Sequence, residues 1–73
     1  METRIKNLRT ENNYTQEYVA NKLNIKQNTY SQYESGIREL PIECLIKLAI
    51  LYDTSTDYIL NLTDDEFPYK RKK

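Results

Sequence analysis

The segment 16–36 constrains the fold more than any other part of the chain, because its pattern predicts two short helices joined by a tight corner. Apolar residues recur at helical spacing over about residues 16–23, which predicts the first helix. The second helix is predicted over about residues 27–35, and Gly36, the single glycine of the chain, follows it directly. A glycine just past a helix end accepts the left-handed conformation that such an end requires. The apolar positions of the first helix are Val19, Ala20 and Leu23.

Both ends of this first helix carry suitable residues. Thr15 is a good N-cap, because its hydroxyl can accept a hydrogen bond from an unpaired amide of the first turn. Asn24 is predicted to end the helix, since asparagine tolerates the left-handed conformation well, and Ile25 then returns the chain to the core. Lys26 precedes the second helix where a capping residue would contribute about 1 kcal/mol. We therefore expect this cation to serve function rather than fold.

The second helix has two faces of different chemistry. At about 100° per residue, one arc of about 140° holds only uncharged hydrogen-bonding side chains, and the opposite arc holds packing residues. Amides offer a donor and an acceptor in one plane, which suits bidentate contact with an adenine edge. The alternative is an ordinary solvent-exposed face, although such faces usually carry Glu and Lys and this one carries neither. The polar arc consists of Gln27, Asn28, Ser31 and Gln32, and the packing arc of Tyr30, Tyr33 and Glu34.

The spacing of this segment resembles the helix-turn-helix of the lambda-repressor/Cro-type family, also called xenobiotic-response-element-type regulators. The resemblance covers about residues 4–62 and implies an all-α, compact five-helix DNA-binding domain with the second helix of the pair in the major groove. The sequence departs from the family at Asn24, Lys26 and the bulky Tyr30. The matching residues are Gln16, Ala20, Leu23, Ile25, Gln27, Tyr30, Glu34 and Gly36 in the segment, and Ile5, Leu8, Arg9, Ile42, Glu43, Leu45, Leu48, Ala49 and 55–60 outside it.

The resemblance also implies how the polar residues contact double-stranded DNA. The N-terminal half of the second helix would read base edges, and the start of the preceding helix would hold phosphates by side chain and amide. Cations beside the groove would add sequence-independent attraction. The base-reading candidates are Gln27, Asn28, Ser31 and Gln32. The phosphate-binding candidates are Thr15, Gln16, Lys26 and Arg38.

An arginine lies on the apolar side of the predicted first helix of the chain, over about residues 3–12, where Thr3 can act as the cap. This residue, Arg9, needs a partner, and Glu34 on the packing face of the second helix of the pair is the candidate. In the resembled family these two positions form a partly buried ion pair. The alternative is that Arg9 extends its charged end to solvent.

The C-terminal half predicts two further helices and a tail. Pro41 suits the first turn of a helix over about residues 41–52, and Ser55 or Thr56 would cap a short fifth helix that ends at Asn61. Residues 1–62 then form the domain, and residues 63–73 read as a flexible charged tail whose KRKK end could attract phosphates or be simply solvated. The predicted core face of the longer helix consists of Ile42, Leu45, Leu48, Ala49 and Tyr52.

Composition restricts the classes of function. Eleven basic and eleven acidic residues give a neutral chain, which counts mildly against nucleic-acid binding, although residues 1–38 carry six basic and four acidic side chains. With no histidine and no glycine-rich phosphate loop, we expect neither an enzyme nor a cofactor, and the consecutive carboxylates at 64–66 are better explained as solvated than as a metal site. No segment is long and apolar enough for a membrane span, and the single Cys44 fits a reducing compartment. We expect a cytoplasmic, nucleoid-associated protein of a prokaryote or phage.

Two isoleucines on the predicted fourth helix miss its core face. Ile46 and Ile50 lie roughly 100–140° from the centre of that face, which implies burial against something else. The first hypothesis is that they form the contact of a homodimer, and that this dimer binds a palindromic operator with half-sites about 34 Å apart. The alternative is that the tail folds back over them through Phe67 and Tyr69. The dimer candidates are Ile46, Ile50, Tyr58 and Leu62.

These features predict a sequence-specific DNA-binding transcriptional regulator that acts as a repressor. Two alternatives use the same fold. The chain could be the antitoxin that binds a toxin protein, which the neutral net charge favours slightly, or a controller of restriction–modification genes.

Overall fold

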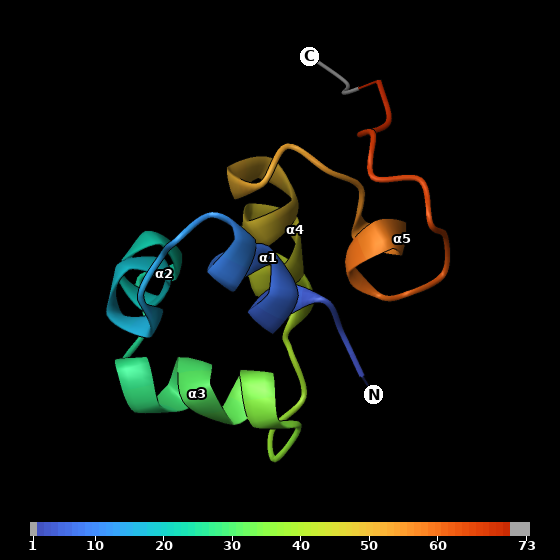
Figure 1. Ribbon diagram of the computed structural model, residues 1–73. Helices are drawn as coiled ribbons and strands as arrows, with labels where there is room; N and C mark the ends of the chain where they lie inside the picture. Colours follow the sequence, from blue (N-terminus) through green and yellow to red (C-terminus); the bar gives the residue numbers. More distant parts are fainter. Residues whose placement is uncertain (1, 71–73) are drawn as a thin grey trace.

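The computed structural model describes residues 2–70, and this part of the chain is helical throughout its regular structure. Helix α4 lies at the centre, with α2 and α3 toward one side and α5 on the other (Figure 1). The all-α, five-helix architecture predicted from the sequence is confirmed, and among the described residues no helix has the length and apolarity of a membrane span. The helices are α1 (Ile5–Glu11), α2 (Gln16–Leu23), α3 (Gln27–Ser35), α4 (Ile42–Leu51) and α5 (Thr56–Ile59).

One core unites the five helices. Each helix contributes one large side chain whose exposed fraction is at most 1%, so no helix is stabilised by its own turn alone. Burying an aliphatic side chain of this size stabilises the fold by about 1.5–3 kcal/mol relative to leaving it in water. The five residues, in helix order, are Ile5, Val19, Tyr30, Leu48 and Ile59.

Every helix is followed by a residue with positive φ, and this explains how a chain with one glycine makes five sharp helix ends. After α2, Asn24 has φ 58° and its N–H donates to the Asn21 carbonyl at 3.1 Å, while the Ile25 N–H donates to the Ala20 carbonyl at 3.0 Å. This pair of bonds is the Schellman motif, and the same pattern recurs after α1, α4 and α5. The left-handed residues are Asn13, Asn24, Gly36, Asp53 and Asn61.

The helix caps agree with the sequence in most places. The hydroxyl of Thr15 accepts a hydrogen bond from the Tyr18 N–H at 3.0 Å, and that of Ser55 accepts one from Tyr58 at 3.0 Å. The N-cap of α1 differs from the expected Thr3, because the helix begins at Ile5 and its N-cap residue is Arg4. The Arg4 N–H donates to the Ile59 carbonyl at 2.9 Å, so contact with α5 sets the start of α1.

The expected core face of α4 is wrong at its first residue. Ile42 is 75% exposed, whereas Cys44, not expected in the core, is only 7% exposed. At about 100° per residue, Ile42 lies about 120° from Leu48, the most buried residue of this helix, and Cys44 lies only about 40° away on the other side. The buried stripe is therefore centred closer to Cys44 than apolarity alone indicated.

Residues 63–70 run along the outside of α5 (Figure 1). The Thr54 hydroxyl donates to the Glu66 carbonyl at 2.6 Å, and the Tyr69 hydroxyl donates to the Asp57 carboxylate at 2.5 Å. Arg4 Nη2 also donates to the Asp64 carboxylate at 2.9 Å, so the segment is joined to the domain at three places. The flexibility expected of residues 63–73 stays a prediction, and residues 71–73 of the KRKK end lie outside the described residues.

Candidate nucleic-acid interface

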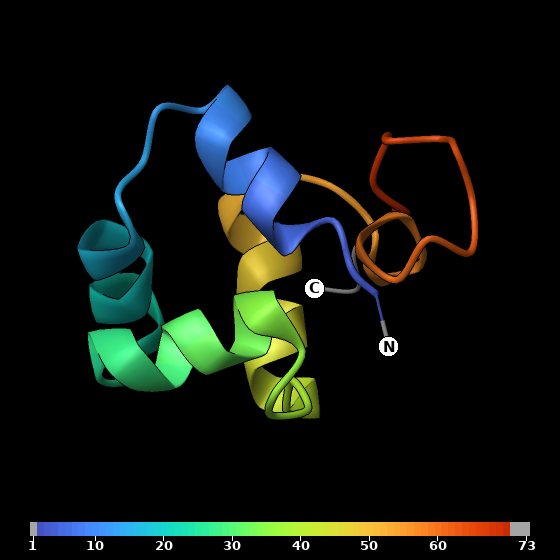
Figure 2. The ribbon, with the colours of Figure 1, turned by 60° about the horizontal axis from the view of Figure 1, so that its bottom comes forward.

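Helix α3 presents its polar arc away from the core. Tyr30 and Tyr33 on the opposite arc are 0% and 9% exposed, so they fix the rotation of the helix about its axis. Figure 2 brings α3 forward, and no other helix crosses in front of it. Of the predicted base-reading residues, the exposed ones are Gln27 and Asn28 and the half-buried ones are Ser31 and Gln32.

The ion pair expected between α1 and α3 is present. The Arg9 Nε lies 2.6 Å from Glu34 Oε2, and Arg9 Nη2 donates to Oε1 at 3.2 Å, so the contact is bidentate. Arg9 Nη1 also donates to the Tyr14 carbonyl at 3.0 Å. The two side chains are 14% and 5% exposed, so Arg9 does not extend freely to solvent. The pair fixes the packing side of α3 against α1.

The same carboxylate orients the first residue of α2. Gln16 Nε2 donates to Glu34 Oε1 at 3.1 Å. Because an ionised carboxylate only accepts hydrogen bonds, the amide nitrogen of Gln16 must face Glu34, which leaves its second N–H available. The predicted phosphate contact of Gln16 would therefore use this second N–H and the backbone amides of the first turn.

Burial and pairing act in opposite directions on Glu34. Burial alone would raise the pKa of this carboxyl, but the hydrogen bonds from Arg9 and Gln16 outweigh it and hold the pKa below its usual value. The hydrogen bond to Glu34 likewise raises the pKa of Arg9. Glu34 is thus ionised at neutral pH, and its charge is balanced within the protein by Arg9.

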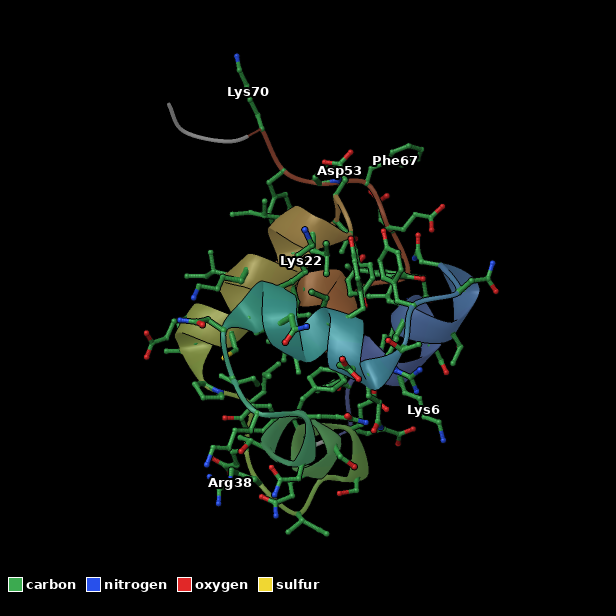
Figure 3. All side chains as sticks on the ribbon, turned by 90° about the vertical axis from the view of Figure 1, so that its left-hand side faces the viewer. Lys6, Lys22, Arg38, Asp53, Phe67 and Lys70 are labelled. Atoms are coloured by element: carbon green, nitrogen blue, oxygen red, sulfur yellow. The ribbon has the colours of Figure 1, made fainter. Side chains whose placement is uncertain are left out.

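Two predicted phosphate-binding cations lie at the ends of α3. Lys26 is the N-cap residue of α3, and its exposed side chain makes no capping bond. Arg38 follows the helix, and its backbone N–H donates to the Gln32 carbonyl at 3.2 Å. Figure 3 shows the Arg38 side chain beside α3, directed away from the body of the protein. The contacts of Lys26 and Arg38 with phosphates stay predictions.

Sequence reasoning missed two polar residues of this region. A hollow of about 310 Å³ opens where α1, α2 and α3 meet, and it includes Lys6 and Ser35. Ser35 lies about 40° from Ser31 around α3, within the polar arc, so the helical period could have found it. Lys6 lies one turn before Arg9 on the same side of α1, and this spacing could have indicated that it lies near α3. The hollow is lined by Lys6, Arg9, Gln16, Ser31, Glu34 and Ser35.

The four dimer candidates lie in different surroundings, and their role in a dimer stays a prediction. Ile46 and Ile50 are 48% and 58% exposed, and they line a hollow of about 280 Å³ with Pro68 and Tyr69 of the C-terminal segment. Tyr58 instead lies under the Arg4 guanidinium, whose central carbon is 4.0 Å from the ring centroid. It lines a different hollow with Phe67, and Leu62 is exposed.

Comparison with known proteins identifies similar chains. The family model described as helix-turn-helix matches residues 5–59. The uncharacterized HTH-type transcriptional regulator YobD of Bacillus subtilis is 41% identical over 96% of this chain and 62% of its own length. The HTH-type transcriptional regulator ImmR of the same organism is 46% identical over 78% of this chain and 45% of its length. The cryptic phage CTXphi transcriptional repressor RstR of Vibrio cholerae is 40% identical over 68% of this chain and 45% of its length.

The chain thus spans about half of the length of these curated relatives. No solved structure matches it significantly. The matched region contains α1 to α5 and every residue of the polar arc.

Proposed function

Because this chain belongs to the lambda-repressor/Cro-type helix-turn-helix family of transcriptional regulators, we propose that it represses transcription by binding operator DNA with α3 in the major groove. The observation that carries the proposal is the open arc of amides and hydroxyls on α3, fixed outward by two buried tyrosines. Repression is favoured over activation by the similarity to the phage repressor RstR. The proposed place of action is the cytoplasm, on chromosomal or phage DNA.

In this proposal the polar arc reads bases. Gln27 and Asn28 lie in the first turn of α3, the part of a recognition helix that enters deepest into the groove. Gln32 and Ser31 follow one turn later and reach the neighbouring base pairs. Each bidentate amide contact contributes about 1–3 kcal/mol of discrimination against a wrong base.

Phosphate contacts hold the helix in register. Thr15 and Gln16 offer the unpaired amides of the α2 N-terminus, which favours an anion there. Lys26 and Arg38 carry cations at the two ends of α3. This local supply of positive charge offsets the neutral charge of the whole chain, since acidic residues gather near the other end at 53, 57 and 64–66.

The proposed active form is a two-fold dimer on a palindromic operator. One recognition helix buries too small an area for tight specific binding, and two half-sites about 34 Å apart double the contact. Ile46 and Ile50 are the proposed contact, because they stay half-exposed beside Pro68 and Tyr69. Tyr58 and Leu62 are less suited to the same contact, since Arg4 covers the Tyr58 ring.

Selection of genomic fragments by the purified protein tests the function. We expect enrichment of one inverted repeat, and protection of its major groove in a footprint at each half-site. The Gln32→Ala variant is expected to lose this enrichment while it still binds bulk DNA. Failure of the wild-type protein to enrich any sequence would contradict the proposal.

A further inference from the structure

The hollow between α1, α2 and α3 lies on the proposed DNA-binding side of the molecule. Two of its lining residues, Gln16 and Ser31, belong to the predicted phosphate-binding and base-reading sets. Its other polar residues are Lys6 from α1 and Ser35 from the last turn of α3. The DNA contacts proposed above come from α2, α3 and the residues beside them, and none comes from α1. The hollow places a residue of α1 next to these contacts.

The accessible charge at this hollow is the ammonium of Lys6. Within residues 2–70, no hydrogen bond, ion pair or ring contact engages the Lys6 side chain, which is exposed. The one carboxylate that lines the hollow belongs to Glu34, whose side chain is 5% exposed and pairs with Arg9 at 2.6 Å. The hollow therefore has an unpaired cation at its rim and an internally neutralised ion pair at its base. The Ser31 hydroxyl and the second N–H of Gln16 are further donors, whereas the Ser35 hydroxyl already donates to the Gln32 carbonyl at 3.2 Å.

The position of Lys6 relative to Arg38 is informative. In Figure 3, the two labelled side chains lie on opposite sides of α3, with Arg38 at one side and Lys6 at the other. Lys6 shares its hollow with Ser31 and Ser35, and Arg38 is not among the residues that line this hollow. The major groove is about 12 Å wide and is bounded by two phosphate backbones, so a helix lying in it has one backbone on each side.

We propose that Lys6 and the hollow beside it bind a phosphodiester of the DNA backbone on the opposite edge of the major groove from the phosphate bound by Arg38. The inference rests on the proposed function, and it adds α1 to the DNA-binding elements. One oxygen of the singly charged phosphodiester accepts from the Lys6 ammonium, while a second oxygen accepts from the free N–H of Gln16. The two cations then straddle α3 and fix its tilt in the groove.

The test is the salt dependence of binding to a fixed random-sequence duplex and to the selected operator. Lys6→Gln is expected to reduce the slope of log K against log salt by about 0.9 on both duplexes, because one counterion fewer is released. Lys6→Arg keeps the cation and is expected to keep the slope. The matched control is Lys47→Gln, since Lys47 is an exposed lysine of α4 and belongs to none of the proposed DNA-binding residues. Circular dichroism verifies that each variant is folded.

Single methylphosphonate substitutions along each operator strand locate the contact. One neutral phosphate is expected to weaken binding of the wild type but not of Lys6→Gln. A second is expected to weaken binding of the wild type but not of Arg38→Gln, and the two phosphates should lie on opposite strands. An unchanged salt slope for Lys6→Gln, or both phosphates on one strand, would overturn the inference while operator binding by the wild type still supports the proposed function. A wild type that binds no DNA overturns both.

Discussion

The Arg9 guanidinium and the Glu34 carboxylate meet at 2.6 Å and join α1 to α3 across 25 positions of sequence. Glu34 also accepts from Gln16, so one carboxylate links all three helices of the proposed DNA-binding side. The contact places the phosphate-binding start of α2 and the polar arc of α3 in a fixed relation. The Arg9–Glu34 pair therefore affects both the stability of the fold and the orientation of the proposed DNA-binding residues.

Removal of the Glu34 charge is expected to destabilise the protein. Glu34→Gln leaves the Arg9 charge partly buried without its counterion, and the loss approaches the range of about 3–5 kcal/mol observed for broken buried pairs. Urea unfolding measures it. Glu43→Gln, on the exposed side of the first turn of α4, is the matched control and should change the unfolding free energy by less than about 0.5 kcal/mol. A Glu34→Gln variant as stable as this control would contradict the role of the pair.

The same pair predicts a pH dependence of stability. The folded pKa of Glu34 is below its unfolded value of about 4.3, so the folded state binds fewer protons here than the unfolded state. The stabilisation is therefore complete above the unfolded pKa and is lost as pH falls through the folded pKa. We expect the difference in unfolding free energy between wild type and Glu34→Gln to be constant at neutral pH and to shrink below about pH 4. A difference that does not change over this range would exclude the linkage.

The hydroxyl of Tyr52 is buried without a hydrogen-bond partner among the described residues. Burial raises the pKa of this phenol, so it stays neutral. Tyr52→Phe keeps the ring that stacks on Tyr14 and removes only the unsatisfied group, so stability should stay equal or rise by about 1 kcal/mol. Tyr52→Ala, which also removes the ring, should cost about 3 kcal/mol. Thermal unfolding of the two variants distinguishes the contributions, and a large loss for Tyr52→Phe would indicate an unseen partner.

The base-reading assignment predicts a loss of specificity rather than of general affinity. Gln27→Ala or Gln32→Ala should weaken operator binding by about 1–3 kcal/mol and leave binding to a random duplex almost unchanged. Arg38→Gln should weaken both and flatten the salt dependence, because a phosphate contact carries no sequence information. Fluorescence anisotropy on the two duplexes measures this. Equal losses on both duplexes for Gln27→Ala would remove Gln27 from the base-reading set.

The exposed isoleucines of α4 predict the state of association. If Ile46 and Ile50 form the dimer contact, Ile50→Glu should give a folded monomer that no longer binds the palindrome cooperatively. Ile42→Glu is the control, since Ile42 is exposed on the same helix but lies outside the hollow with Pro68 and Tyr69. Sedimentation of both variants measures association.

The alternative role of the tail gives a different outcome. If the C-terminal segment covers these isoleucines within one chain, truncation after Asp64 should reproduce the effect of Ile50→Glu on stability, without any change of association. A wild-type protein that stays monomeric at high concentration would exclude the free dimer.

The sequence by itself determined the helices, most of their caps and the polar arc. Thr15, Asn24 and Gly36 act through bonds and dihedral angles within a few residues, so local pattern is sufficient to place them. The same is true of the two arcs of α3, because the helical period fixes which side chains share a face. The Arg9–Glu34 pair came from family resemblance combined with the position of each residue on its helix.

The tertiary structure alone decided which neighbours each face meets. The rotation of α4 buries Cys44 and exposes Ile42, because the facing helices, and not apolarity, set the centre of its stripe. Arg4 covers the Tyr58 ring, a contact between the two ends of the chain that no local pattern encodes. The Lys6 hollow likewise exists only because three helices meet there. Such contacts depend on the packing of distant segments, and sequence periodicity carries no information about which segments will meet.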